Sequence, residues 1–450
     1  MDIEKRLLTC HKVYQTFYNV LNSYVSDYYV ENHWNKLSTS WSNHFEEIKI
    51  SELSDLLNLS KPLNGMVHPL TLLCLRSVLD NFTLPRRRAD LPISPEISPF
   101  KDNKKFMNFF WKNVKLKKRH EIDIMAKLCY RLAKETNCFH IVDIGSGVGH
   151  LSRMLSYGYG IKVCTVEAVE AFTKLAESMD SNFENALTKR NICHIKNTFK
   201  TVHINKRITK DITVQDFLTI VQNAFDNKNV RFGIVGLHPC GDLGATLLKL
   251  YMECPNIVFI NIASCCYMKI TLNPTTESCF PLSNFCKAQN IVLSYLVCEI
   301  ACHAIENYSE KLKNDAEYEK LKIHAYRAAL EDLLTSVDPE LKHSIVGSVK
   351  YTDNLTFVNY VKKVCDNNNL PNLPDEKVLF YEDLITTTWR KVVSFYSIRL
   401  LLAPLVENII LLDRWLYVTE NGSECKILPL FDCNISPRNL VLSANKRKDV

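Results

Sequence analysis

The chain has 450 residues, of which 46% are apolar and 23% are charged, and its formal net charge is +6. These values are ordinary for a globular protein, and the charge is too small for this length to indicate a particular partner. The length favours two or three lobes. Of the 17 cysteines, no two have the CxxC spacing of zinc modules or thioredoxin-like sites, so we expect reduced thiols and no metal.

The sequence carries no pattern typical of a membrane or secretory segment. The N-terminus has no apolar signal core. The most apolar long stretch, 392–418, is interrupted by four charged residues, which are too many for a bilayer span. We therefore expect an intracellular protein without membrane binding, in the cytoplasm rather than the nucleus.

The first hundred residues predict a helical lobe. Apolar periodicity indicates helices within 9–29, 50–57 and 68–81, and no catalytic motif lies among them. Several prolines and the basic run Arg86–Arg88 then mark a boundary between about residues 84 and 104. The sequence therefore predicts a separate lobe over 1–100.

A basic and aromatic segment, 101–120, follows the boundary. It holds eight Lys or Arg residues against one acid, with Phe106, Phe109, Phe110 and Trp111 among them. Such a segment can track a nucleic-acid backbone and stack bases. We favour the simpler interpretation, a helix with aromatic residues in the core and a solvated basic face. A second helix is expected over 122–135.

The central motif of the chain is HIVDIGSGVGH, residues 140–150. Its β-branched run predicts a strand buried on both faces. Gly145, Gly147 and Gly149 follow, and residues 151–157 read as a helix. The glycines therefore lie at a strand-to-helix turn, where backbone N–H groups and the helix N-terminus can face a polar ligand.

Alternating strands and helices continue after this turn. Strands are expected at 162–166, 232–237 and 257–262, with a further strand somewhere in the irregular segment 193–215. The helices expected between them cover 168–187, 217–225 and 244–252. This alternation predicts an α/β fold with a parallel sheet and right-handed crossovers.

The remaining residues predict an insertion followed by the end of the core. Residues 275–388 are too long for a connection and mostly helical, with the clearest helix at 314–334. Residues 389–419 are helical, and 425–431 with 440–443 read as an antiparallel pair that closes the sheet. The expected domains are therefore 1–100, a core of 101–274, an insertion of 275–388 and a C-terminal core segment of 389–450.

The glycine turn excludes two nucleotide sites and favours a third. The NAD fingerprint needs glycine at its sixth position, where His150 stands, and the Gly-Lys-Ser/Thr end of a P-loop is absent. Glu167 ends the next strand and can accept hydrogen bonds from both hydroxyls of a ribose. An adenosine ribose without pyrophosphate indicates S-adenosylmethionine. The expected cofactor residues are Asp143, Gly145, Ser146, Gly147, Gly149, Glu167 and Asp216, with Asp143 near the ammonium group and Asp216 near the adenine.

Two further clusters follow later strands and are expected in the same crevice, since ligands of open α/β sheets bind at the carboxyl ends of the strands. His238, Cys240 and Asp242 are candidates for substrate orientation or proton removal. Tyr267 is a candidate for stacking on a substrate or hydrogen bonding to it. A metal site built from His238, Cys240, Cys265 and Cys266 is disfavoured because the spacing is unlike known zinc patterns.

Seven stretches, in order, resemble one known family. They are KKRHE (117–121), DIGSGVGHLSR (143–153), GLHPCGDL (236–243), SCCYMK (264–269), HAYRAALE (324–331), ILLDRWLYVTENG (410–422) and LFDCNISPRNLVLSA (430–444). On these stretches the chain resembles the methyltransferase-like protein 25 family, which includes the ribosomal RNA adenine dimethylase domain-containing proteins. The resemblance implies a class I methyltransferase fold, a Rossmann-like sheet closed by an antiparallel hairpin, with S-adenosylmethionine as cofactor.

The resemblance does not identify the acceptor. RNA adenine enzymes usually carry an Asn-x-x-aromatic quartet where this chain has Leu237 to Cys240, so adenine is not predicted. We expect methyl transfer to a macromolecule, with RNA preferred over protein because of the basic segments. The alternative is a non-catalytic binding or scaffold protein built on the same fold, against which the intact Asp143, glycines and Glu167 argue.

Overall fold

The computed structural model describes residues 2–63, 67–88, 104–112, 114–189, 199–272, 278–345, 347 and 349–446, without the side chains of 104–106. Most of the expected boundary at 84–104 and part of the irregular segment 193–215 lie outside these residues. The chain forms two compact units. The first comprises residues 1–7, 84–295 and 408–450, and the second comprises 8–83 and 296–407.

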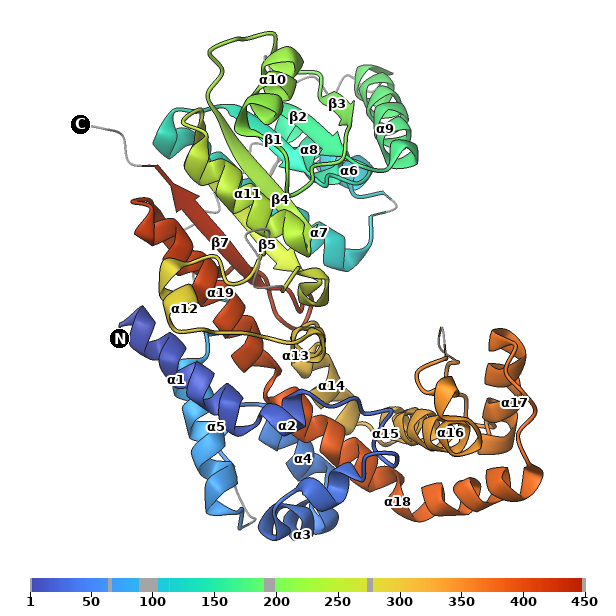
Figure 1. Cartoon of the computed structure of the whole chain (residues 1–450). Helices are drawn as coiled ribbons and strands as arrows, with labels where there is room; N and C mark the ends of the chain where they lie inside the picture. The colour runs from blue at the N-terminus through green and yellow to red at the C-terminus, as the bar shows by residue number, and fades with distance from the viewer. Residues whose placement is uncertain are drawn as a thin grey trace. The chain divides into compact units, whose positions relative to one another are not determined.

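The first unit is built on a seven-stranded sheet of order β3-β2-β1-β4-β5-β7-β6 (Figure 1). Strands β1 to β5 are parallel, and β7 runs antiparallel to both β5 and β6. The strands are β1 (His140–Ile144), β2 (Lys162–Glu167), β3 (Val202–Asn205), β4 (Phe232–Cys240), β5 (Ile257–Cys265), β6 (Glu424–Pro429) and β7 (Leu440–Asn445). The class I α/β fold and the closing antiparallel pair are confirmed.

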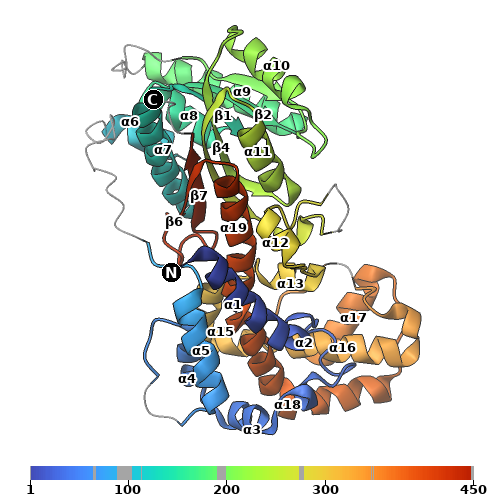
Figure 2. The same ribbon diagram turned by 60° about the vertical axis from the view of Figure 1, so that its left-hand side comes forward.

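Helices cover both faces of this sheet. Figures 1 and 2 show α7 (Leu116–Thr136) and α8 (His150–Arg153) on one face, and α10 (Val214–Phe225) and α11 (Asp242–Glu253) on the other. The remaining helical elements of the unit are α6 (Lys104–Phe110), α9 (Glu170–Lys189), η4 (Tyr267–Lys269) and α12 (Asn284–Ala288). The helix expected over 151–157 is α8 continued by a π-helical turn, Met154–Gly158.

The aromatic residues of the basic segment pack into the core of this unit. The rings of Phe109 and Phe183 stack with centroids 5.3 Å apart, and Phe110 is 5% exposed. Trp111 packs edge-on against Phe110. The simpler interpretation of this segment is therefore confirmed for these three residues.

A buried charge network joins four elements of the first unit. The Arg153 guanidinium contacts Asp180 Oδ1 at 2.6 Å, and both side chains are under 5% exposed. His203 Nε2 lies 3.1 Å from Asp180 Oδ2, and its Nδ1 lies 2.9 Å from Thr165 Oγ1. The network thus connects α8, α9 and the β2–β3 edge behind the glycine turn.

The second unit is helical. Within it α4 packs on α14, and both α16 and α17 pack on α18. Its helical elements are α2 (Tyr18–Leu21), η1 (His33–Lys36), α3 (Thr39–Glu47), α4 (Ile50–Leu57), α5 (Leu70–Phe82), α14 (Ile305–Leu312), α15 (Asp315–Lys320), α16 (Ile323–Val337), η5 (Pro339–Leu341), α17 (Phe357–Asn368) and α18 (Asp375–Leu401). Helices α1 (Ile3–Thr16), α13 (Tyr295–Ile300) and α19 (Ala403–Glu420) contain the points where the chain passes between the units.

Two segments that were predicted as single helices are each divided into two helices in the structure. The helix expected at 314–334 is divided into α15 and α16, because the backbone tightens to i→i−3 hydrogen bonds at Leu321 and His324. The helix expected at 389–419 begins earlier, as α18, and is divided from α19 at Leu402. Pro404 lacks the N–H that a continuous helix would need, and it lies instead in the first turn of α19, where proline is tolerated.

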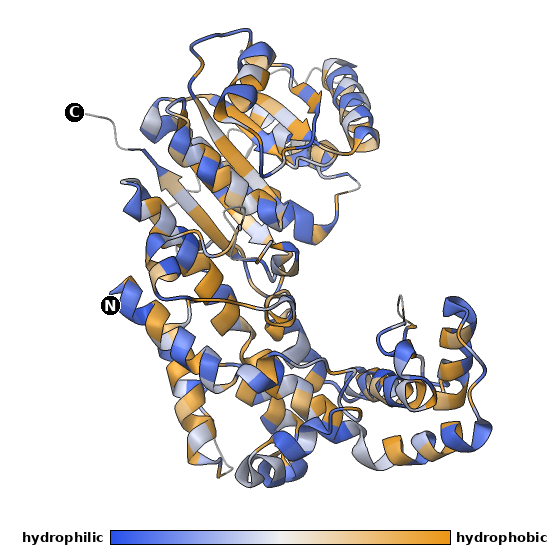
Figure 3. Cartoon of the chain, viewed as in Figure 1, coloured by the Kyte–Doolittle hydropathy of each residue, from blue (hydrophilic) through white to orange (hydrophobic). Residues whose placement is uncertain are grey.

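By length and composition, residues 375–420 include a helical stretch that could span a membrane, but its apolar window is fully buried in the structure. Figure 3 shows apolar residues concentrated in α19 and in the strands of the sheet. Burial of this kind is typical of a core helix.

Candidate active site

A pocket of about 580 Å³ lies at the carboxyl ends of β1, β2 and β4. Ile144 of β1 and Gly145 just after it line the pocket, as do Glu167 of β2 and His238 and Cys240 of β4. Strand order reverses between β1 and β4, the position at which open α/β sheets bind their ligands. The structure thus brings the glycine turn and the 238–242 cluster together, as expected.

Glu167 is held by the backbone on both carboxylate oxygens. Gly147 N donates to Oε2 and Val169 N donates to Oε1, each at 2.9 Å. A carboxylate has about four lone-pair sites, so each oxygen can still accept a hydroxyl. Gly147 itself has φ +56° and no described atom within 4 Å of the place a Cβ would take. The acid and the open backbone therefore form one ligand-binding surface.

The other residues of the glycine turn have different surroundings. Asp143 is 1% exposed, accepts a hydrogen bond from Ser152 and does not line the pocket. Ser146 Oγ is buried and has no hydrogen-bond partner among the described residues. A Cβ at Gly149 would lie 3.5 Å from the side chains of Ala176 and His203, so the glycine allows α9 and β3 to lie close to this turn. The orphaned hydroxyl of Ser146 fits a turn that binds a polar ligand.

Burial raises the pKa of Asp143 to about 6, against the lowering effect of the Ser152 hydrogen bond. Between about pH 4 and 6 the unfolded chain has released this proton while the folded protein keeps it, so stability falls as the pH rises through that window. Asp143→Asn removes this titration. We expect wild type to lose about 2–3 kcal/mol relative to the variant between pH 4 and pH 7, measured by urea unfolding at both pH values. An equal difference at both would contradict the buried-carboxyl account.

The prediction that Asp216 lies near the ligand is not supported by its position. Asp216 is exposed in the first turn of α10, where its backbone N–H and carboxylate both bond Thr213 Oγ1, and it does not line the pocket. Asp211, five residues earlier, does line it. Both acids follow β3. The apolar pattern predicts a helix that begins at residue 217, which would leave Asp216 in the preceding loop, but α10 begins at Val214 and includes Asp216 in its first turn.

His238 forms a dyad with Glu121, which sequence analysis did not place in the site. His238 Nε2 lies 3.1 Å from Glu121 Oε1, and the carboxylate is 3% exposed. Although burial acts to raise it, the pKa of Glu121 is lowered by His238, by a hydrogen bond from Ser436 and by the charge of Lys117. An ionised carboxylate thus orients an imidazole that lines the pocket, the arrangement of a general base.

Two other candidate site residues, Asp242 and Tyr267, are held by contacts within the fold. Asp242 lines the pocket, but its oxygens accept from the N and Oγ1 of Thr271, each at 2.6 Å. Tyr267 is 1% exposed and faces the Arg438 guanidinium, 5.9 Å from its ring centroid. The expectation that Tyr267 meets a substrate was wrong, because the turn after β5 packs its ring into the core.

Cys240 lies beside two other thiols. The hydrogen bond from Cys265 lowers the pKa of Cys240 to about 5, against the opposing effect of burial. The same interaction raises the pKa of Cys265. Cys266 Sγ lies 3.4 Å from Cys240 Sγ, and none of these three cysteines forms a disulfide.

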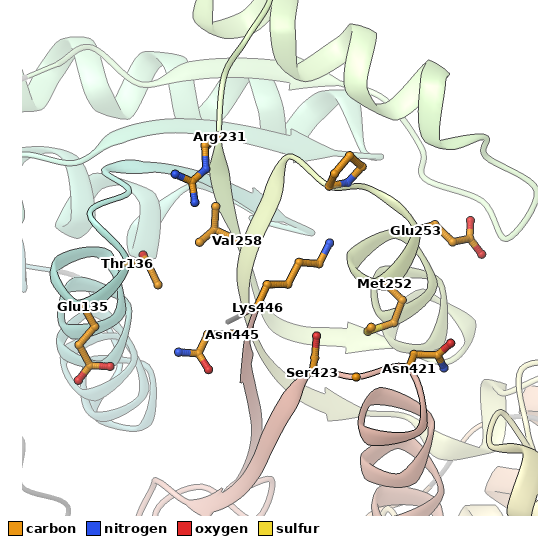
Figure 4. A pocket seen from close by; sticks show the side chains of 12 residues that line it. Glu135, Thr136, Arg231, Met252, Glu253, Val258, Asn421, Ser423, Asn445 and Lys446 are labelled. Carbon is orange, nitrogen blue, oxygen red and sulfur yellow. The ribbon is translucent and has the colours of Figure 1, made fainter. Parts of the chain in front are cut away.

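A larger cavity, about 640 Å³, lies at the amino ends of β4 and β5, at the opposite end of these strands from the first pocket (Figure 4). Arg231 before β4, Val258 at the start of β5 and Lys446 after β7 line it. The Lys446 ammonium donates to Cys254 O at 2.6 Å. This cavity is remote from the glycine turn, so the smaller pocket is the candidate active site.

Comparisons with known proteins agree with this geometry. A family model described as a methyltransferase domain matches residues 117–273. The human protein named probable methyltransferase-like protein 25 is 21% identical over 472 residues, covering 77% of this chain and 76% of its own. The mouse protein of the same name is 23% identical over 257 residues, covering 54% of this chain and 40% of its own length.

Among solved structures, the plantazolicin methyltransferase BpumL in complex with SAH is similar at 11% identity and a TM-score of 0.22. The match covers 61% of this chain and 87% of that one. A score this low carries no structural argument, so the assignment rests on the domain match and the relatives.

The matched domain makes S-adenosylmethionine the cofactor, and the residues present fit it. Glu167 offers two acceptors for a ribose, and Gly145 and Gly147 offer open backbone beside it. Asp211 also lines the pocket and adds a carboxylate acceptor to its wall. The chain therefore contains a methyltransferase domain over residues 117–273 and is similar to the proteins named probable methyltransferase-like protein 25.

Proposed function

We propose that this chain transfers a methyl group from S-adenosylmethionine to a macromolecule, and that RNA is the acceptor. The observation that carries the proposal is the pocket itself, which is lined by Glu167, by Gly145 of the glycine turn and by His238, whose ring Glu121 holds. The bound sulfonium supplies an electrophilic methyl group. The chain then has to hold an acceptor in line and manage one proton.

His238 is the residue suited to that proton. Its Nε2 faces Glu121, so the carboxylate sets the orientation of the ring and stabilises the imidazolium that proton removal produces. Glu121 is fixed in turn by Ser436 Oγ at 2.5 Å. We infer that His238 removes the proton of the acceptor and that Glu121 positions it.

Positive charge near the pocket favours a polyanionic acceptor. Lys206, Arg207 and Lys210 line the pocket between β3 and α10, with Asp211 as the acid of that segment. Lys117 and Lys118 are exposed in the first turn of α7, and the charge of Lys118 acts on Asp143 behind the glycine turn. Cations grouped this way suit phosphate contacts.

The test is incubation of the purified chain and tritiated S-adenosylmethionine with RNA and protein fractions from cells that lack the enzyme. Label in the RNA fraction supports the proposal. Label only in the protein fraction overturns the choice of RNA while keeping the enzyme. Absence of binding in calorimetry with S-adenosylmethionine overturns the enzyme and favours the scaffold alternative.

Glu167→Gln is expected to weaken S-adenosylmethionine binding by roughly 1–3 kcal/mol. The substitution replaces one carboxylate oxygen by an NH₂ group, which can accept neither a ribose hydroxyl nor the backbone N–H that this oxygen now binds. Isothermal calorimetry measures this change. Glu170→Gln is the matched control, because Glu170 lies three residues later, exposed at the start of α9. Equal affinities of the Glu167 variant and wild type would show that the ribose lies elsewhere.

A further inference from the structure

Three thiols converge at the carboxyl edge of the sheet. Cys240 Sγ lies 3.2 Å from Cys265 Sγ and 3.4 Å from Cys266 Sγ. All three sulfur atoms lie within 4.8 Å of one another. Cys240 is exposed and lines the candidate active-site pocket, whereas Cys265 is 9% exposed. This group, Cys240, Cys265 and Cys266, is called the thiol cluster below.

The backbone departs from ordinary strand geometry to bring these thiols together. The pairing of β4 with β5 shifts register between Leu237 and Cys240, and His238 in this bulge has φ 70°. The bulge brings Cys240 opposite Cys265. Bulges and left-handed non-glycine residues are costly, and they occur preferentially at functional sites.

The neighbouring turn makes a second such departure. Successive side chains of a strand point to opposite faces, so adjacent cysteines on a strand would diverge. Cys266 instead has φ 50°, and its sulfur comes to lie beside Cys240. Gly241 approaches the backbone of Lys269 so closely that a Cβ would lie 2.5 Å from Lys269 O. The two turns are therefore packed tightly against each other around the sulfur atoms.

The chemistry of three convergent thiols suits a soft metal ion. Zinc binds cysteine sulfur at about 2.3 Å, and tetrahedral geometry then separates two sulfurs by about 3.8 Å. To reach this separation, the observed distances of 3.2 and 3.4 Å would open by about 0.6 and 0.4 Å. Three thiolates around a divalent ion carry one net negative charge, and the cation of Lys269 acts favourably on Cys240 and Cys266.

We propose that the thiol cluster binds one zinc ion through three thiolates, leaving a fourth coordination position open on the side of the active-site pocket. An open fourth position is the arrangement of zinc ions that bind water or a substrate atom. Among the described residues, the ligand atoms that converge here are the three cysteine sulfurs, and His238 is not one of the group. Binding converts up to three thiols to thiolates and releases their protons to solvent, so the affinity falls as the pH is lowered.

Titration of the reduced full-length chain with Co²⁺, as a spectroscopic probe, and then with Zn²⁺ tests the proposal. We expect a thiolate-to-cobalt charge-transfer band and the visible bands of a tetrahedral ion, reaching their maximum at one ion per chain and lost when zinc displaces cobalt. Absence of these bands would overturn the proposal. Mass spectrometry of the metal-free protein shows a disulfide as a loss of two hydrogen masses. If two cluster cysteines form such a disulfide and the reduced protein takes up no metal, the proposal is overturned as well.

Cys266→Ser is the matched variant, since serine keeps the size and removes one sulfur ligand. We expect its zinc affinity to fall by at least ~100-fold, more than loss of an outer-shell partner costs. Cys74→Ser is the control, because Cys74 is an exposed cysteine of the second unit. Equal losses in both variants, or in neither, would show that zinc binds elsewhere. The readout is metal binding, so it stands or falls independently of the proposed methyl transfer.

Discussion

His238→Ala is expected to slow methyl transfer by roughly 10²–10⁴-fold while leaving the affinity for S-adenosylmethionine unchanged. The reason is that the imidazole lines the pocket from β4 and is oriented by Glu121, whereas the expected ribose contact is Glu167 at the end of β2. Single-turnover rates with the labelled acceptor fraction and calorimetry with the cofactor measure the two effects separately.

Glu121→Gln tests the positioning role within the same dyad. The lowered pKa of Glu121 keeps this carboxylate ionised at neutral pH, and its stabilising charge is lost only as the pH falls through that lowered value. The variant is expected to change the pH profile of the rate, which a purely structural role would leave in place. His343→Ala is the control, because His343 is a half-exposed histidine of the second unit.

For the first variant, a rate of methyl transfer in His238→Ala equal to that of wild type would show that His238 takes no part in the mechanism.

Asp180→Asn is expected to lower the free energy of unfolding by roughly 3–5 kcal/mol. The substitution leaves the Arg153 guanidinium buried without its charged partner, and it weakens the contact that holds His203. An uncompensated buried charge is costlier than the loss of the pair's attraction alone. Urea unfolding followed by circular dichroism measures the change.

Glu177→Gln on the same helix is the control for this substitution. Glu177 is exposed on α9, so its charge is solvated in the folded and the unfolded chain alike. We expect its unfolding midpoint to match wild type. If Asp180→Asn unfolded at the same midpoint as this control, the buried network would not contribute to stability as inferred.

The alternating part of the fold was predictable because local patterns carry it. Buried parallel strands read as apolar runs, and β1, β2, β4 and β5 each lie where such a run stands. Helix continuity was less predictable. The breaks at Leu321 and Leu402 change only a few backbone hydrogen bonds, which the apolar periodicity does not register.

The candidate site divides in the same way. The glycine turn and Glu167 were found because a strand, a turn and an acid lie within 30 residues of one another. Glu121 was not assigned to the site, because it lies 117 residues from His238 and only the packing of α7 brings the two together. Tyr267 was placed in the site wrongly, because the direction of a side chain after a strand depends on the turn that follows.

The sequence by itself determined the fold class, the cofactor turn and the family resemblance, since each of these is written in contiguous residues. Tertiary structure decided the individual side-chain contacts in and beside the pocket. It paired His238 with Glu121, placed Asp211 rather than Asp216 on the pocket wall, and gathered Cys240, Cys265 and Cys266. These contacts depend on a strand bulge and on left-handed turns, whose effect on side-chain direction is set by packing and not by local propensity.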